Sequence, residues 1–147
     1  MIQPLRCVID ASVSIKQFIP DPLSDKVKQL FSYLDQPETA FFVPDLFYIE
    51  STNIIWKYVR ATPYEATEAV RDLERLKSLS LQVVSTVDLM EEAFQIALNQ
   101  NISAYDAAYV TLSSRVNAPL LTQDRKLFNA LASSSYDVQF FADFPLP

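Results

Sequence analysis

The chain has 147 residues, half of them hydrophobic, and carries a formal net charge of −6. This length and apolar content exclude a disordered chain and suit a single domain with a core, which we expect over residues 1–147. No apolar run approaches the roughly 20 residues that cross a membrane. The first six residues lack the layout of a signal peptide, so we expect a cytoplasmic protein without a membrane segment.

Three absences narrow the possible chemistry. The sequence contains no histidine, no glycine and one cysteine, Cys7. An internal disulfide, the common zinc sites, imidazole-dependent nucleophilic or RNA-cleaving catalysis and glycine-rich phosphate loops are therefore excluded. Catalysis would have to use carboxylates, hydroxyls, Lys, Arg or Tyr. Carboxylates without imidazole or thiolate ligands favour a hard cation, Mg²⁺ or Mn²⁺.

The negative charge bears on nucleic-acid binding. It argues mildly against a surface that follows nucleic acid through many Lys and Arg side chains. It is compatible with a nucleic-acid enzyme whose acids gather at a metal site, because bound cations cancel local charge.

Strands and helices are expected to alternate along the chain. Apolar runs predict five strands, the last at an edge, over residues 7–9, 40–43, 81–84, 120–122 and 138–141. Amphipathic spacing and cap residues predict seven helices, over residues 11–18, 24–34, 45–60, 63–76, 86–98, 103–112 and 123–131. This alternation predicts an α/β fold, a three-layer α/β/α sandwich around a central, mainly parallel sheet of four to five strands.

Several helix ends are predicted in more detail. Asp45 and Thr86 are expected to cap the helices that follow them. Thr62 and Pro63 are expected to start a further helix, with the proline at its first position. The asparagine-rich residues 99–101 should end a helix in the left-handed region, where glycine is usual.

Helical spacing predicts an apolar face on several helices, including the following two. In the helix over residues 86–98, helical spacing assigns it to Met90, Ala93, Phe94, Ala97 and Leu98. In the helix over residues 103–112, it assigns it to Tyr105, Ala108, Tyr109 and Leu112.

Four carboxylates occupy similar places in this pattern. Asp10 follows the first strand and Asp124 follows the fourth. Glu50 lies on the helix after the second strand, and Asp106 lies in the first turn of the helix that begins at Ser103. The carboxyl ends of parallel strands are where open α/β sheets bind their ligands. The four acids are therefore candidates for one shared site.

Each acid also has a structural interpretation. Asp10 and Asp124 would cap helices, and Asp106 would form a capping box with Ser103. Glu50, which is costly to bury unpaired, would be satisfied by Asn53. Possible ion-pair partners for the acids are Lys16, Lys57 and Arg125.

The segments around these acids resemble the four signature blocks of the PIN-domain family. The blocks are Val-Ile-Asp-Ala-Ser at 8–12, Glu-Ser-Thr-Asn at 50–53, Tyr-Asp-Ala-Ala-Tyr-Val at 105–110 and Leu-Thr-Gln-Asp-Arg-Lys-Leu at 121–127. Their order and spacing are most similar to those of the VapC-like toxin ribonucleases of bacterial VapBC toxin–antitoxin systems. One departure is the lack of glycine at the turn positions 99–101 and before Pro119, which leaves the acidic signature intact.

The resemblance implies a metal-dependent endoribonuclease. Its catalytic and metal-binding residues would be Asp10, Glu50, Asp106 and Asp124, supported by Ser12, Asn53 and Thr122. It further implies Mg²⁺ or Mn²⁺ as cofactor, an RNA substrate such as tRNA or rRNA, a cognate antitoxin protein and a homodimer.

Other functions stay open at this stage. The chain could be a PIN-domain nuclease of RNA processing outside a toxin–antitoxin pair, or a catalytically silent PIN-like adaptor. Phosphatases with an aspartyl nucleophile also begin with a strand and an aspartate. Ser12 stands where that class usually has a second aspartate, which disfavours it.

Overall fold

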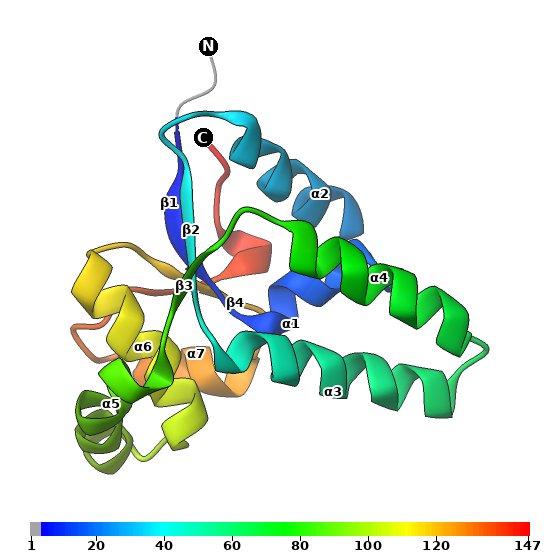
Figure 1. Cartoon of the computed structure of the whole chain (residues 1–147). Coiled ribbons are helices and arrows are strands. Elements are labelled where there is room, and N and C mark those ends of the chain that lie inside the picture. Colours follow the sequence, from blue (N-terminus) through cyan, green and yellow to red (C-terminus); the bar gives the residue numbers. More distant parts are fainter. Residues whose placement is uncertain (1–3) are drawn as a thin grey trace.

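A five-stranded sheet lies at the centre of the computed structural model, which describes residues 4–147 (Figure 1). All neighbouring strands are parallel, in the order β3-β2-β1-β4-β5. The predicted sandwich and its five strands are confirmed. The expectation of no signal peptide concerns the first six residues, and residues 1–3 of these lie outside the described part of the chain. Within residues 4–147, no helix combines the length and the apolar character needed to cross a membrane.

The elements have the following bounds. The strands are β1 (Arg6–Ile9), β2 (Ala40–Pro44), β3 (Gln82–Val84), β4 (Leu120–Thr122) and β5 (Val138–Phe140). The α-helices are α1 (Ala11–Ser14), α2 (Ser24–Ser32), α3 (Leu46–Ala61), α4 (Ala66–Ser78), α5 (Thr86–Gln100), α6 (Ala104–Val116) and α7 (Arg125–Leu131). Short 3₁₀ helices are η1 (Ile15–Gln17), η2 (Tyr33–Asp35) and η3 (Phe141–Asp143).

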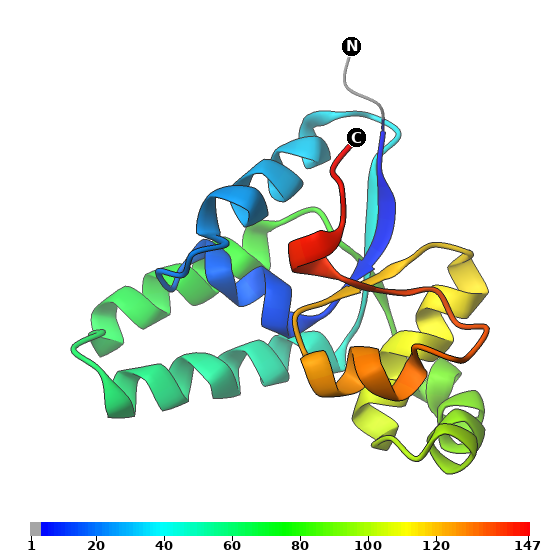
Figure 2. The ribbon, with the colours of Figure 1, turned by 180° about the vertical axis from the view of Figure 1, so that it is seen from behind.

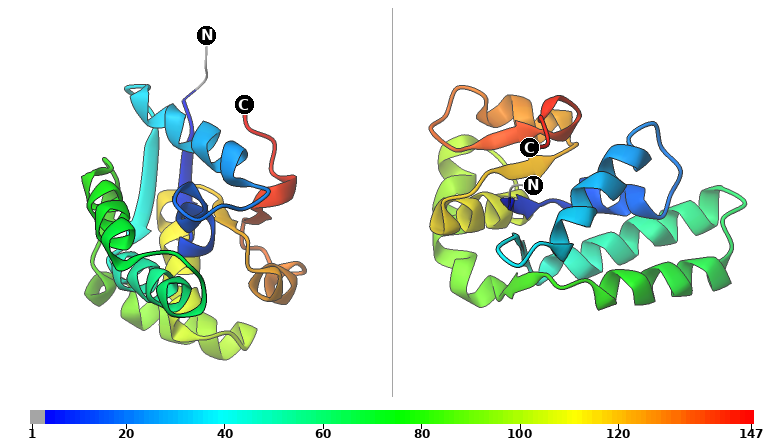
Figure 3. Two further views of the ribbon diagram at one scale, coloured as in Figure 1. Left: turned by 90° about the vertical axis from the view of Figure 1, so that its right-hand side faces the viewer. Right: turned by 90° about the horizontal axis from the view of Figure 1, so that it is seen from above.

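The central strand β1 is buried on both faces, as its unbroken apolar run predicts. Val8 faces a core shared with α5, α6 and α7, whereas Cys7 and Ile9 face a second core shared with α2. In the view from above, α5 and α6 lie to one side of β1 and α2 lies to the other (Figure 3). The sheet and the helices packed against its two faces form the three layers of the sandwich, with one core on each face.

The strand order changes direction next to β1. The chain builds β2 and β3 on one side of β1, and then crosses through α5 and α6 to add β4 and β5 on the other. The boundary between β1 and β4 is therefore the topological switch point, where α/β sheets form their ligand crevice. Ile9 pairs with Leu121, so Asp10 and Thr122 follow at neighbouring positions just beyond that pair.

Helices α3 and α4 form a long antiparallel pair that extends away from the sheet (Figures 1 and 2). A smaller apolar cluster, formed by Ile15, Ile19, Ile55 and Ala69, joins this pair to η1 and the loop after it. Glu50 lies in the part of α3 nearest the sheet, five residues after Asp45. The packing of α3 thus brings Glu50 toward the switch point.

Three predicted helix starts differ from the structure. Asp45 makes no side-chain cap bond in α3, and its Oδ1 instead accepts from the amide of Thr86 at 3.1 Å. Ser85 caps α5 in place of Thr86, because its Oγ accepts from the amide of Val87 at 3.3 Å. Thr62 closes α3 by donating to the carbonyl of Tyr58 at 2.6 Å, so α4 begins later, at Ala66.

The predicted buried face of α5 is wrong for three of its five members. Met90, Phe94 and Leu98 are 62%, 57% and 62% exposed, whereas the buried positions of α5 are Leu89, Ala93 and Ile96. Helical spacing fits both sets, and packing against α6 selects the second. On α6, Tyr105 is also exposed, unlike the other members of its predicted face. A row of exposed apolar side chains therefore runs along α5.

Two asparagines end helices in the left-handed region. Asn101 has φ 54° after α5, as predicted for residues 99–101, and Asn117 has φ 51° after α6. Asparagine tolerates this region better than residues with larger or branched side chains. It thereby replaces glycine in a chain that has none.

Substitutions at Asn117 test this account of the glycine-free turns. Asn117→Gly should leave the free energy of unfolding nearly unchanged, because glycine adopts positive φ without steric cost. Asn117→Val should lower it by about 1–2 kcal/mol, since a β-branched side chain clashes in this conformation. Urea unfolding of the two variants measures the difference. Equal stabilities for the two variants would contradict the account.

Candidate active site

The carboxylate of Asp10 is held by two hydroxyl groups. Its Oδ2 accepts from Ser12 Oγ at 2.8 Å and from Thr122 Oγ1 at 2.7 Å, and the residue is only 8% exposed. Asp10 occupies the N-cap position of α1 but makes no cap bond, so its interpretation as a cap is wrong. Ser12 and Thr122 lie where the sequence predicts supporting residues.

The same hydroxyls fix the loop after β4. Ser12 Oγ accepts from the amide of Gln123 at 3.0 Å, and Thr122 Oγ1 accepts from the amide of Asp124 at 3.0 Å. Each hydroxyl therefore donates to Asp10 and accepts from the segment that carries Asp124. Asp10 and Asp124 are coupled through this network.

Asp124 caps α7, as its structural interpretation predicts. Its Oδ1 accepts from the amides of Lys126 at 3.0 Å and Leu127 at 3.1 Å. Among the bonds formed within residues 4–147, none uses Oδ2 of Asp124. One oxygen can therefore cap the helix while the other remains available to a ligand.

Asp106 lies in the first turn of α6, which Ser103 caps. Ser103 Oγ accepts from the amide of Asp106 at 3.1 Å, so the predicted start of this helix is confirmed. The side chain of Asp106 is half-buried and lies near Asp10 and Asp124, whose charges act on it. The helix start thus positions a third acid near the switch point.

Glu50 has a partner that sequence reasoning missed. The hydroxyl of Tyr109 donates to Glu50 Oε1 at 2.6 Å, and Tyr109 is 1% exposed. In the sequence, Tyr109 falls on a predicted apolar helix face and within the block at 105–110, and neither pattern indicates a bond to Glu50. Its position three residues after Asp106, on the same side of α6, is the signal that could have identified it. Asn53 is exposed, and within the described residues no hydrogen bond joins it to Glu50.

We refer to Asp10, Glu50, Asp106 and Asp124 as the acidic cluster, because their charges act on one another. Burial, with a smaller contribution from the charge of Asp124, raises the pKa of Asp10 against the opposing effect of its two hydroxyl donors. Burial raises the pKa of Glu50 to about 7; the Tyr109 hydrogen bond opposes this, and the charges of Asp10 and Asp106 add to it. Burial, together with the charges of Asp10 and Asp124, raises the pKa of Asp106 to about 6.

The acidic cluster has no ion-pair partner within residues 4–147. Of the three predicted candidates, Lys16 pairs with Asp21 at 2.9 Å, and Arg125 lies over the ring of Phe140 at 3.9 Å from its centroid. The third, Lys57, is exposed and forms none of the ion pairs of the described chain. Lys126 is close enough to lower the pKa of Asp106 slightly. The cluster therefore carries uncompensated negative charge, which favours a cation.

The residues present fit a hard divalent cation by their chemistry. The cluster offers carboxylate oxygens only, the ligands that Mg²⁺ and Mn²⁺ prefer. Among residues 4–147, no three acid or cysteine side chains already form an arrangement that could hold a metal ion.

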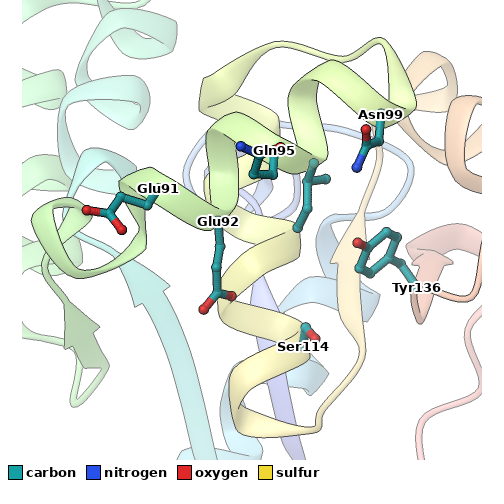
Figure 4. A pocket seen from close by; sticks show the side chains of 7 residues that line it. Glu91, Glu92, Gln95, Asn99, Ser114 and Tyr136 are labelled. Carbon is teal, nitrogen blue, oxygen red and sulfur yellow. The ribbon is translucent and has the colours of Figure 1, made fainter.

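A hollow of about 310 Å³ opens beside the cluster. Asp106, Asp124 and Lys126 lie on its wall, together with residues of the segment between α5 and α6 and residues of α7. A second hollow, of about 430 Å³, lies between α5, α6 and Tyr136 and contains no member of the acidic cluster (Figure 4). The first hollow is therefore the candidate substrate site.

A comparison of the sequence with models of known families identifies the class of protein. The model of the PIN-domain family matches residues 7–133, and the chain belongs to this family.

Individual relatives agree with this assignment. Ribonuclease VapC3 of Pyrobaculum aerophilum is 32% identical over 125 residues, which cover 84% of this chain and 92% of the relative. A toxin–antitoxin complex from Klebsiella pneumoniae contains a similar chain, with a TM-score of 0.63, 15% identity and coverage of 91% and 96% of the two chains. The sarcin-ricin loop cleaving toxin VapC20 of Mycobacterium tuberculosis has a TM-score of 0.61 and 17% identity, with 84% and 94% covered. The two structures share the fold of this chain.

The raised pKa of Asp10 predicts that its charge opposes folding when no metal is bound. The fold favours the protonated carboxyl, so the free-energy cost of the ionised Asp10 increases as the pH rises above the ordinary range of an aspartate. In EDTA at pH 8, Asp10→Asn should therefore raise the melting temperature by about 3 °C, with a smaller gain at pH 5. Thermal unfolding followed by circular dichroism at both pH values measures this.

The exposed Asp35 provides the matched control. Asp35→Asn should leave the melting temperature nearly unchanged at both pH values. If Asp10→Asn instead lowers the melting temperature at pH 8, the charge of Asp10 contributes to the fold and the cluster is not a site of unfavourable charge.

Proposed function

We propose that this protein is a Mg²⁺- or Mn²⁺-dependent endoribonuclease and the toxin of a type II toxin–antitoxin pair. The observation that carries the proposal is the acidic cluster, in which Asp10 is buried, the other three acids are half-buried, and none has an ion-pair partner among residues 4–147. Clustered acids with raised pKa values at a ligand crevice are typical of function. A relative that is 32% identical and named a ribonuclease supports RNA as substrate.

In this proposal the chain's residues divide into three roles. Asp10, Glu50, Asp106 and Asp124 hold the cation, which when bound lowers the pKa of a water molecule and stabilises charge on the attacked phosphate. Ser12 and Thr122 orient Asp10 through their hydrogen bonds, as outer groups do for metal ligands. Glu50 also orients the attacking water. Asn53 keeps the supporting role that the resemblance implies, although it is exposed and forms no hydrogen bond with the four acids within residues 4–147.

The products follow from water as the nucleophile. Attack by water on an RNA phosphodiester leaves a 5′-phosphate and a 3′-hydroxyl, whereas attack by the ribose 2′-hydroxyl gives a cyclic phosphate. The absence of histidine in the sequence removes the usual imidazole acid and base of the second route. The hollow beside the cluster has Asp106, Asp124 and Lys126 on its wall and offers room for a phosphate and its sugar.

Other parts of the proposal rest on the family resemblance. They are a tRNA or rRNA substrate, action in the cytoplasm where these RNAs occur, a cognate antitoxin and one functional domain over residues 1–147. Relatives named VapC and a neighbour in a toxin–antitoxin complex support the antitoxin.

Cleavage of total RNA tests the nuclease. With Mg²⁺ or Mn²⁺, the wild type should give defined fragments with 5′-phosphate ends, and EDTA should abolish cleavage. Asp10→Asn should reduce the rate at least about 100-fold, because metal-ion catalysis contributes several kcal/mol. Asp35→Asn is the control and should retain full activity. No difference between wild type, Asp10→Asn and EDTA would remove the nuclease and favour a silent adaptor, and cyclic phosphate ends would contradict attack by water.

Growth assays separate the toxin from a processing nuclease. Expression of an active toxin should stop growth of a bacterial host, and Asp10→Asn should relieve the arrest. An enzyme that cleaves RNA in vitro but leaves growth unaffected would favour the RNA-processing alternative.

We also propose that the exposed row on α5 forms the homodimer interface. Val87, Met90, Phe94 and Leu98 are between 57% and 72% exposed, which is unusual for apolar side chains that share one helix face. The row runs along a single helix, so two copies related by a two-fold axis can pack α5 against α5. Because these side chains are already exposed, such an interface could form without a change in the fold.

Mutation of Phe94 tests this interface. Phe94→Glu should convert a dimer to a monomer in light scattering after gel filtration, because it places a charge within the buried interface. Val70→Glu, at an exposed valine on α4, is the matched control and should leave the dimer intact. A wild type that is monomeric at high concentration, or a dimer unaffected by Phe94→Glu, would contradict this interface.

A further inference from the structure

One side-chain hydrogen bond links helices α3 and α6 across the acidic cluster, from Tyr109 to Glu50 at 2.6 Å. We propose that Tyr109 is a positioning residue, whose hydroxyl holds the Glu50 carboxylate in the orientation that binds the cation. This inference rests on the proposed function, because it assigns Glu50 to the metal site. It adds a residue outside the four acids and their predicted supporting groups.

Glu50 needs such a partner because of its place on α3. The buried face of this helix is formed by Phe47, Ser51 and Ile55, and Glu50 lies beside that face and is half-buried. Its neighbour Ile49 is 69% exposed, so solvent is close. A glutamate with several rotatable bonds would turn toward water from this position unless another group held it.

Tyr109 is suited to hold Glu50 because its own ring cannot move. The residue is 1% exposed and belongs to the main core between the sheet and α6. Rigid packing fixes the position of the hydroxyl, and the bond to Oε1 leaves Oε2 without a partner among the bonds of residues 4–147. Helix α6 thus carries one acid, Asp106, and one turn later the donor that orients a second acid.

The chain contains a matched pair remote from the cluster. Tyr64, which precedes α4, donates to the carboxylate of Asp72 in the middle of that helix, and this pair shares no residue with the acidic cluster or its hollow. Tyr64→Phe removes the same type of hydrogen bond as Tyr109→Phe. It therefore reports the general cost of losing a tyrosine–carboxylate bond without any effect on the cation.

The test compares these two variants with the wild type by two readouts. Calorimetric titration with Mn²⁺ should show that Tyr109→Phe weakens binding about ten-fold. At saturating Mn²⁺, kcat for RNA cleavage should fall about 10- to 100-fold with KM nearly unchanged. Tyr64→Phe should change neither readout. Both variants keep an aromatic ring, so both should unfold cooperatively, within a few degrees of each other.

A double mutant distinguishes positioning from a general structural role. Glu50→Gln removes the charge that Tyr109 orients, so adding Tyr109→Phe to it should cause no further loss of Mn²⁺ affinity or kcat. An equal loss in both backgrounds, or a Tyr109→Phe variant indistinguishable from wild type, would overturn the role. If the wild type binds Mn²⁺ but cleaves no RNA, the proposed function fails while the Mn²⁺ titration still tests Tyr109. A wild type that binds no Mn²⁺ would remove this role together with the site.

Discussion

The burial of one carboxylate, that of Asp10, is the constraint around which this molecule is arranged. Its Oδ2 accepts from Ser12 and Thr122, and burial raises its pKa despite these two bonds. Charge that is costly to bury persists at a site when a ligand compensates it. The central position of β1 makes Asp10 the meeting point of both halves of the sheet, so the same feature determines where a ligand binds.

Much of this arrangement could be predicted from the sequence. The fully apolar run before Asp10 predicts a strand buried on both faces, and the alternation of strands with helices predicts the parallel sheet. Thr122 ends β4 beside β1, so register alone brings its hydroxyl to Asp10. The absence of histidine and the presence of only one cysteine favour oxygen ligands before any fold is known. These inferences succeed because each depends on local pattern or on composition.

Other features depend on choices that the local pattern does not make. Two sets of residues on α5 satisfy helical spacing, and only packing against α6 decides that Leu89 is buried and Met90 exposed. Thr62 has the residue type of a helix start, yet its hydroxyl bonds back to Tyr58 and closes the preceding helix. Helical spacing places Tyr109 on an apolar helix face. The acceptor of its hydroxyl lies 59 residues away in the sequence, so no local pattern predicts the bond.

The central claim is that the acidic cluster holds a divalent cation at the switch point. Crystals soaked in Mn²⁺ near pH 8 test this most directly, because the ion's anomalous scattering locates it without assumptions about function. The account predicts a manganese peak within coordination distance of Asp10 and Asp106, beyond the carboxyl ends of β1 and β4, and its loss in Asp10→Asn. No peak at that position at saturating Mn²⁺, or one bound only at acids elsewhere on the surface, would contradict it.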